Sequence, residues 1–271
     1  MDAVWIITVF VIIDDLMEHL DHRTHCLAAV SDAEVITIAV VAAKYFHNHH
    51  ERAVCVMRDL GYLSGRLSVS RFNRRLHALA DWLAFIPTTL GEVFTEGEVF
   101  VIDSLPVPVC RRARARRCRK VRGRIYCGYC AAKKEKFFGW RLHLVCTPMG
   151  LPVRFTILPA SLHDLTPVHE LTAHLPAGAR VFGDKAFNSV DDETTIFEEL
   201  GVRLVPVRKA NMQPHGWFLD ELELREYRHT IETVNSQLEN MGVERLHART
   251  NAGLDLKLHA SLIAVTCTNF A

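Results

Sequence analysis

The sequence predicts an all-α region over residues 1–97, followed by an α/β domain with a mixed sheet over residues 98–271. Two observations predict this division. Apolar residues in the first region recur at three- and four-residue spacing, which is the pattern of core-facing helices. From residue 98 onward, short β-type apolar runs appear in the order strand, strand, strand, then strand, helix, strand, helix. That order indicates a hairpin beside parallel crossover units.

The composition is that of an ordinary globular protein, with 271 residues, 49% hydrophobic content, 23% charged content and a net charge of +1. The apolar stretch 5–13 is nine residues long, whereas a membrane span needs about twenty. Asp2 is the only charge before it, so the basic start of a signal peptide is missing. We therefore expect a buried first helix, no membrane partner, a cytoplasmic protein and thiols at the eight cysteines.

Three helices are predicted after the first one. Residues 31–34 have the form of a capping box and predict a helix to about residue 45. A second helix covers about 51–60 and stops at a glycine. A third starts at Ser68 or Ser70 and is ended by Pro87.

The third predicted helix is basic on the faces outside its apolar stripe, where Arg71, Arg74 and Arg75 lie. A helix, a short glycine-containing turn and a basic helix together have the layout of a DNA-reading helix-turn-helix. Many helical bundles also expose an arginine-rich face to solvent. DNA contact and a plain solvated surface therefore both stay open for this helix.

The second region contains five predicted strands and two predicted helices. The strands cover residues 98–104, 137–147, 151–160, 179–184 and 202–207. The first helix opens at Asn188 or Ser189, with acids in its first turn, and closes at Gly201. The second runs over about 220–240 and presents an apolar face made of Leu224, Tyr227, Ile231, Val234 and Leu238.

Three carboxylates stand out in this region. Asp103 and Asp184 each end a predicted strand, and Glu232 lies beside the apolar face of the long helix. A charge at the end of a buried strand is costly unless a cation is held there, and three adjacent acids cannot all stay ionised without one. Oxygen ligands of this kind suit Mg²⁺. A glutamate on an amphipathic helix is usually solvated, but the two strand-end acids make a shared metal site the better interpretation for Glu232.

Such a triad suits two divalent ions about 3.5–4 Å apart, which would activate an attacking oxygen and stabilise a leaving oxygen in phosphoryl transfer. A basic run indicates the substrate, because it could supply phosphate contacts. Nine of the fourteen residues from Arg111 to Arg124 are Arg or Lys, and none is acidic. Phosphate contacts dominate the affinity of proteins for nucleic acid. The predicted DNA-binding residues are Arg71, Arg74, Arg75, Arg111, Arg112, Arg114, Arg116, Arg117, Arg119, Lys120, Lys133, Lys134 and Arg228.

Several segments together resemble one family. The segments VIDSLPVPVC, the basic run, GY..AKKEKFFGWRLHLV, GDKAFNS and YRHTIETVNSQLE look like the catalytic domain of bacterial insertion-sequence DDE transposases. SRFNRRLHAL resembles the N-terminal region of the same proteins. The resemblance implies a ribonuclease H-like mixed sheet with flanking helices, preceded by an all-α helix-turn-helix-like domain. It also implies that Asp103, Asp184 and Glu232 are catalytic and bind two Mg²⁺ ions, with Mn²⁺ as a substitute.

The reaction implied by the resemblance is hydrolytic cutting at the element's ends, followed by attack of the freed 3′-hydroxyl on target DNA. The expected partners are double-stranded DNA, as terminal inverted repeats and target, and a second copy of the chain in a homodimer. The expected location is the bacterial nucleoid. Two alternatives stay open: a DNA-binding regulator or decayed element protein that does not cut, and a nuclease with the same core.

The sequence departs from the family pattern near Glu232. Distant relatives place a Tyr three residues before the helix Arg and a Lys or Arg seven residues after the Glu. Here those positions hold Arg225 and Glu239, and Tyr227 is out of register. These departures affect the phosphate contacts that the resemblance implies at the two positions, and they leave the metal triad unaffected. The 47 residues between Asp184 and Glu232 leave no room for the large β-insertion of some relatives.

Other groups allow competing interpretations. Cys110, Cys118, Cys127 and Cys130 contain one pair with zinc-knuckle spacing, but ordinary thiols explain them as well. The three histidines of the segment 47–50 suggest either a metal site or a polar helix end.

Two further residues concern the active site itself. Asp164, beside His163, competes with Asp184 as the second carboxylate. Trp217 is either a stacking platform for a flipped base or an ordinary core or surface residue.

Overall fold

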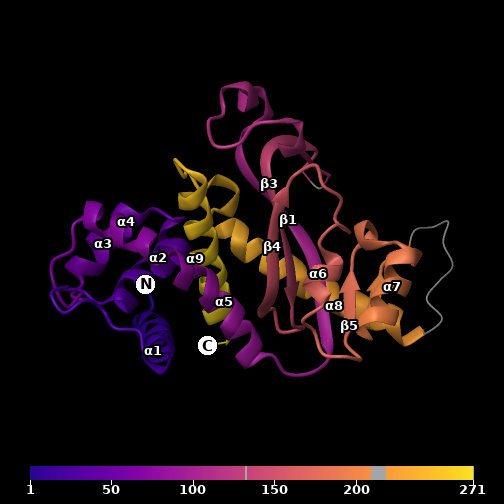
Figure 1. The fold of residues 1–271 in the computed structure, drawn as a ribbon, viewed down its shortest axis with the longest axis horizontal. Coiled ribbons are helices and arrows are strands. Elements are labelled where there is room, and N and C mark those ends of the chain that lie inside the picture. Colours follow the sequence, from indigo (N-terminus) through magenta and orange to yellow (C-terminus); the bar gives the residue numbers. More distant parts are fainter. Residues whose placement is uncertain (132, 209–217, 271) are drawn as a thin grey trace. The chain divides into compact units, whose positions relative to one another are not determined.

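The computed structural model describes residues 1–131, 133–208 and 218–270, and Figure 1 shows its fold. The chain packs as two compact units. Unit 1 contains Met1–Leu90 and Gln237–Ala271, and unit 2 contains Gly91–Ser236. These packing units differ from the predicted division at residues 97/98, because the C-terminal segment packs with the N-terminal helices.

Unit 1 is built around one helix that is buried over most of its length. Its helices are α1 (Ala3–His19), α2 (Asp32–Phe46), α3 (His50–Asp59), α4 (Val69–Ala78), most of α5 (Ala80–Phe94) and α9 (Asn251–Phe270). Every residue of α2 from Ala33 to Ala43 is buried. The predicted capping box is confirmed: the N–H of Glu34 donates to Ser31 Oγ (3.0 Å), and the N–H of Ser31 donates to Glu34 Oε2 (2.5 Å).

The prediction that Pro87 ends a helix is wrong. The break falls at Leu79, whose φ and ψ of −98° and 19° end α4, and Pro87 lies inside α5. A proline inside a helix removes one hydrogen bond and clashes with the preceding turn. Packing compensates for that cost, because Leu83, Ile86 and Leu90 of the same helix are buried. Tertiary contacts therefore carry the helix past the proline.

The first helix, α1, is half-buried, where the sequence predicted a buried one. It packs one face, including Trp5 and Val9, into unit 1, and leaves Val4 73% and Ile7 54% exposed. None of the helices within the described residues is long and apolar enough to cross a membrane.

Unit 2 contains a six-stranded mixed sheet. Its strands are β1 (Val99–Arg111), β2 (Cys127–Cys130), β3 (Glu135–Cys146), β4 (Pro152–Pro159), β5 (Arg180–Gly183) and β6 (Arg203–Pro206). The order is β2-β3-β1-β5-β6, and β4 also pairs with β3. The β1, β3 and β4 pairings are antiparallel, whereas β1, β5 and β6 run parallel. The predicted mixed sheet with flanking helices is confirmed.

Strand β1 extends seven residues beyond its predicted end at residue 104, to Arg111. Its register with β3 shifts between Pro108 and Cys110, so the strand passes its prolines with an irregularity. Gly139 of β3 lies opposite this point. A Cβ there would be only 2.5 Å from the carbonyl oxygen of Val107. The close backbone approach therefore requires glycine at position 139.

Helices pack on both faces of the sheet. On one face, Phe100 and Ile102 join a core with α6 (Val168–Thr172) and α7 (Val190–Leu200). On the other face, α8 (Phe218–Asn240) places Tyr227 against Phe182 of β5, with ring centroids 5.4 Å apart. Because side chains alternate along a strand, Asp103 points to the α8 side. The sequence did not predict β2, α6 or α9.

Candidate functional site

Asp103 lies within β1, which continues past the point where the sequence predicted the strand to end, and Asp184 directly follows the parallel neighbour β5 at the same level. The register pairs Ile102 with Gly183, so the next residue on each strand is one of the two acids. Asp103 is half-buried within the sheet and Asp184 is exposed. The carboxyl ends of neighbouring parallel strands are where α/β folds place ligands. The strand pairing therefore brings the first two predicted acids together.

The surroundings of Asp103 shift the pKa of its carboxyl group upward. The pKa of Asp103 is raised to about 7, mainly by burial and also by the negative charges of Asp184 and Asp164. Two hydrogen bonds oppose this rise: the N–H of Ser104 donates to Oδ1 (2.7 Å), and Nδ2 of Asn235 donates to Oδ2 (2.7 Å). A nearby cation would favour the ionised form of this carboxyl group.

Asp184 is held by local backbone structure. It caps a short 3₁₀ helix, Lys185–Phe187, and accepts a hydrogen bond from the N–H of Ala186 (2.8 Å). This cap orients one carboxylate oxygen.

Helix α8 carries Asn235 and Glu232 on neighbouring faces, and Asn235 contacts Asp103. Residues three apart on a helix are neighbours, so the contact from Asn235 to Asp103 places Glu232 one turn from the acids. The Glu232 side chain is exposed. The hydroxyl of Thr230 donates to the carbonyl of Pro148 (3.0 Å) and fixes the middle of α8 on the same unit.

The third acid does not complete a closed cluster. Within the ranges that the structure describes, no group of three His, Cys, Asp or Glu side chains is close enough to hold a metal ion. The structure thus brings Asp103 and Asp184 together and leaves Glu232 on the adjoining helix face. The donor chemistry suits a hard divalent ion, because all three predicted ligands are carboxylates.

Asp164 is already paired. Nη1 of Arg141 donates to both of its carboxylate oxygens (3.1 and 3.2 Å) and to Ser104 Oγ (3.2 Å). His143 is fully buried beside this pair, with Nδ1 3.8 Å from Asp164, and burial lowers its pKa to about 4. Asp164 therefore forms an ion pair next to the site, whereas Asp184 follows the strand adjacent to that of Asp103.

A family model described as "Transposase DDE domain" matches residues 94–251, which is more than half of the chain. The chain belongs to this transposase family. The match supports an insertion-sequence DDE transposase, and the mixed sheet with flanking helices is that of a ribonuclease H-like DDE domain. Searches of curated proteins and of solved structures found no match.

The matched range of the transposase contains all three predicted catalytic acids and also Asn235, which the sequence analysis missed. One signal pointed to this residue: an asparagine, a weak helix former, lies in a strongly helical segment three residues after Glu232.

The basic run of the transposase continues from the end of β1. We call residues 111–136 the basic tip; Figure 1 shows its first part, in magenta, beyond the ends of β1 and β3. The 3₁₀ helix Arg112–Arg117 carries four arginines, and all four side chains are exposed. Lys133 and Lys134 are exposed too, and Lys120 is half-buried. Arg111 lies eight residues after Asp103 along β1, a span of roughly 27 Å at about 3.4 Å per residue.

The predicted DNA-binding residues of α4 differ in their surroundings. Arg71 and Arg74 are exposed. Arg75 instead donates to Asp32 Oδ1 (2.5 Å) and to the carbonyl of Val30 (2.7 Å), so it anchors the start of α2. The connection from α3 to α4 spans residues 60–68, longer than the three or four residues of a typical helix-turn-helix. DNA reading by α4 stays a prediction.

Three residues named in the predictions lie outside what the structure describes. They are Trp217 and the side chains of Arg225 and Arg228.

The cysteines and histidines form no metal site among the described residues. Cys110, Cys118, Cys127 and Cys130 are free thiols. Burial, followed by the neighbouring Cys118, raises the pKa of Cys110.

The histidines of the segment 47–50 have structural roles. His47 ends α2 in the left-handed conformation, and His49 caps α3 by accepting from the N–H of Arg52 (3.2 Å). His50 packs its ring against Phe72.

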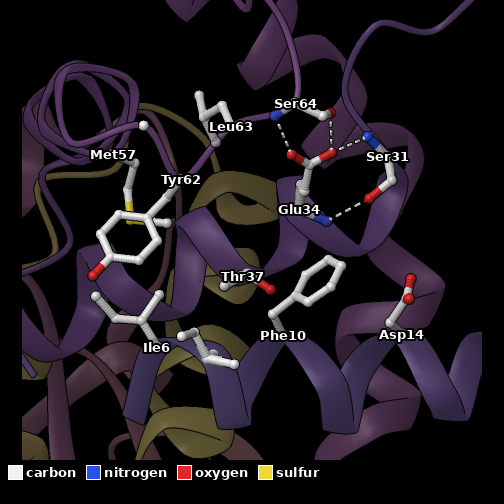
Figure 2. A pocket seen from close by; sticks show the side chains of 12 residues that line it. Ile6, Phe10, Asp14, Ser31, Glu34, Thr37, Met57, Tyr62, Leu63 and Ser64 are labelled. Carbon is white, nitrogen blue, oxygen red and sulfur yellow. Dashed lines mark hydrogen bonds between the residues drawn. The ribbon is translucent and has the colours of Figure 1, made fainter. Parts of the chain in front are cut away.

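A cavity of about 590 Å³ lies in unit 1, between α1, α2 and the loop after α3 (Figure 2). Its walls include Ile6, Phe10 and Tyr62. At one end, Glu34 accepts hydrogen bonds from the backbone and hydroxyl of Ser64 (2.6 and 2.7 Å). This buried carboxylate serves to hold the loop, and none of the predicted catalytic or DNA-binding residues lines the cavity.

Proposed function

We propose that this transposase cuts DNA at the ends of an insertion sequence and joins the freed 3′ ends to target DNA. The observation that carries the proposal is the family match over a domain in which Asp103 of β1 lies level with Asp184, which follows the adjacent parallel strand β5. Helix α8, with Glu232, lies beside them. The position of all three acids within one unit supports a shared catalytic role.

The three acids are the proposed ligands of two Mg²⁺ ions, with Mn²⁺ as a substitute. When bound, the metal ions supply activation of the attacking oxygen and stabilisation of the leaving oxygen. The residues of the chain hold and orient them. The Ser104 N–H and the Asn235 amide fix the Asp103 carboxylate, and the Ala186 N–H fixes that of Asp184.

The basic tip and the exposed arginines of α4 are the proposed DNA contacts. Their role is to neutralise phosphates, so binding should weaken steeply with salt. Two DNA ends must be held during transposition, and a homodimer in the nucleoid is therefore part of the proposal.

A plasmid excision assay tests the catalytic role. Asp103→Ala, Asp184→Ala and Glu232→Ala should each reduce excision at least about 100-fold, because each removes a charge needed in the transition state. Glu226→Gln is the matched control, since Glu226 is an exposed glutamate on the same helix. It should excise at the wild-type rate. If the two single variants Asp103→Ala and Glu232→Ala both excise at the wild-type rate, the triad assignment is wrong.

The products of the same assay separate the alternatives. Cut ends joined to new sites indicate a transposase, and cut ends that are never joined indicate a nuclease. DNA binding without any cutting by the wild-type protein, with Mg²⁺ or Mn²⁺ present, indicates a regulator.

A further inference from the structure

We propose that Asn235 is a positioning residue that ties α8 to β1 and holds Asp103 and Glu232 in register with each other. This inference rests on the proposed function, since it assigns Asn235 to the same carboxylates. Asn235 belongs to none of the predicted sets of catalytic, metal-binding or DNA-binding residues.

The Asp103 carboxylate is held at both of its oxygens. Its two carboxylate oxygens receive one donor each: the Ser104 N–H on Oδ1 and the Asn235 amide on Oδ2, both at 2.7 Å. A carboxylate held at both oxygens cannot rotate about its terminal torsion without losing a bond. The Ser104 bond is local, from the next residue of the strand. Asn235 therefore provides the long-range restraint on this carboxylate.

Asn235 lies beside the packed face of α8. Ile231, Val234 and Leu238 are buried and define the packed face of the helix, and Asn235 follows directly after Val234. Glu232 precedes Asn235 by three residues, which corresponds to about 60° around the helix and about 4.5 Å along it. Fixing Asn235 on Asp103 thus sets both the rotation and the height of Glu232 relative to the strand.

The contact with Asp103 requires a neutral hydrogen-bond donor at position 235. Asparagine is a weak helix former, so its place in the middle of a 23-residue helix needs another reason. An alanine or leucine would favour the helix but donates no hydrogen bond. An aspartate would place a second negative charge against Asp103. A neutral donor of this length is the side chain that fits the contact.

The experiment compares Asn235→Leu, Asn235→Gln and Gln237→Ala in the full-length protein. Leucine matches the shape of asparagine without the donor, and glutamine keeps the amide on a longer stem. Gln237→Ala is the matched control, because Gln237 is another amide of α8 and bonds to Asn269 (2.8 Å) rather than to an acid. Two quantities are measured: binding of Mn²⁺ alone by electron paramagnetic resonance, and the excision rate against Mn²⁺ concentration.

We expect Asn235→Leu to weaken Mn²⁺ binding about tenfold and to raise the Mn²⁺ concentration for half-maximal excision by a similar factor, without loss of thermal stability. Asn235→Gln should recover part of both values, and Gln237→Ala should change neither. Wild-type Mn²⁺ binding and excision in Asn235→Leu would overturn the positioning role. Failure of the proposed function has a different signature, which is excision by Asp103→Ala.

Discussion

Asp103 shows how single residues acquire their roles from their neighbours. Its position at the end of an apolar run predicted a costly charge, and burial does raise its pKa to about 7. Its partner Asn235 lies 132 residues away in sequence, and no local pattern links the two. The acids could therefore be predicted from the sequence, whereas the donor that holds Asp103 required the packed structure.

Arg75 illustrates the opposite case, in which a predicted DNA contact is part of the packing. Burial opposes ionisation of Asp32, but hydrogen bonds from Arg75 and His22 outweigh it and lower the pKa of Asp32. Arg75→Ala should reduce the free energy of unfolding by about 2 kcal/mol, because it removes a charged hydrogen bond from a half-buried acid. Exposed Arg74→Ala should change it by less than about 0.5 kcal/mol. Urea unfolding measures both, and equal effects would contradict the anchoring role.

His50 should make the protein sensitive to acid. Burial, followed by the charge of Lys257, lowers its pKa to about 4. The folded state then binds fewer protons than the unfolded state between pH 6.5 and 4. The stabilising effect of this neutral histidine is complete above pH 6.5 and falls by up to about 1.4 kcal/mol per unit as the pH drops through that window.

Urea unfolding at several pH values tests this expectation. The slope of unfolding free energy against pH should be smaller in His50→Phe than in the wild type. His174→Gln, at an exposed position of unit 2, should keep the wild-type slope. Identical slopes in all three proteins would rule out the contribution of His50.

At the scale of elements, apolar periodicity and caps predicted most helices and strands, and long-range packing decided the exceptions. Strand β1 continues past two prolines because β3 pairs with it almost throughout, and α5 continues past Pro87 because its apolar face is buried. The four-residue strand β2 has too few residues for a periodic signal, and it exists through its pairing with β3.

Gly139 is the residue that should test this pairing. An alanine Cβ would lie 2.5 Å from the oxygen of Val107 and 2.6 Å from the nitrogen of Val109, both backbone atoms that cannot rotate away. Gly139→Ala should therefore lower the free energy of unfolding by about 1–3 kcal/mol, as overpacking does. Thermal unfolding by circular dichroism provides the measurement. An unchanged melting temperature would show that β1 does not approach this closely.

At the scale of the whole molecule, the chain returns to its first unit. Helix α9 packs on the buried helix α2, and the indole N–H of Trp5 donates to the carbonyl of Cys267 (3.2 Å). Asn48 donates through its amide to the carbonyl of Met241 and to Ser261 (both 3.0 Å). The helical unit is therefore completed only by the last residues of the chain.

Removal of residues 251–271 should expose the α2 core. In limited proteolysis followed by mass spectrometry, new cleavage sites should appear within residues 1–90, while the pattern within the sheet of unit 2 stays unchanged. Wild-type protection of residues 1–90 in the truncated chain would mean that they fold without α9.

The sequence by itself determined the class of each region, the two acids that follow apolar runs, the basic tip and the family resemblance. All of these depend on residue type and short-range periodicity. Only the tertiary structure decided that Asp184 follows the parallel neighbour of the strand that carries Asp103, that Asn235 contacts Asp103, that Arg75 is an internal anchor and that α9 completes the N-terminal unit. The physical reason is the same in each case: these contacts join residues that are tens to hundreds of positions apart, and packing alone brings them together.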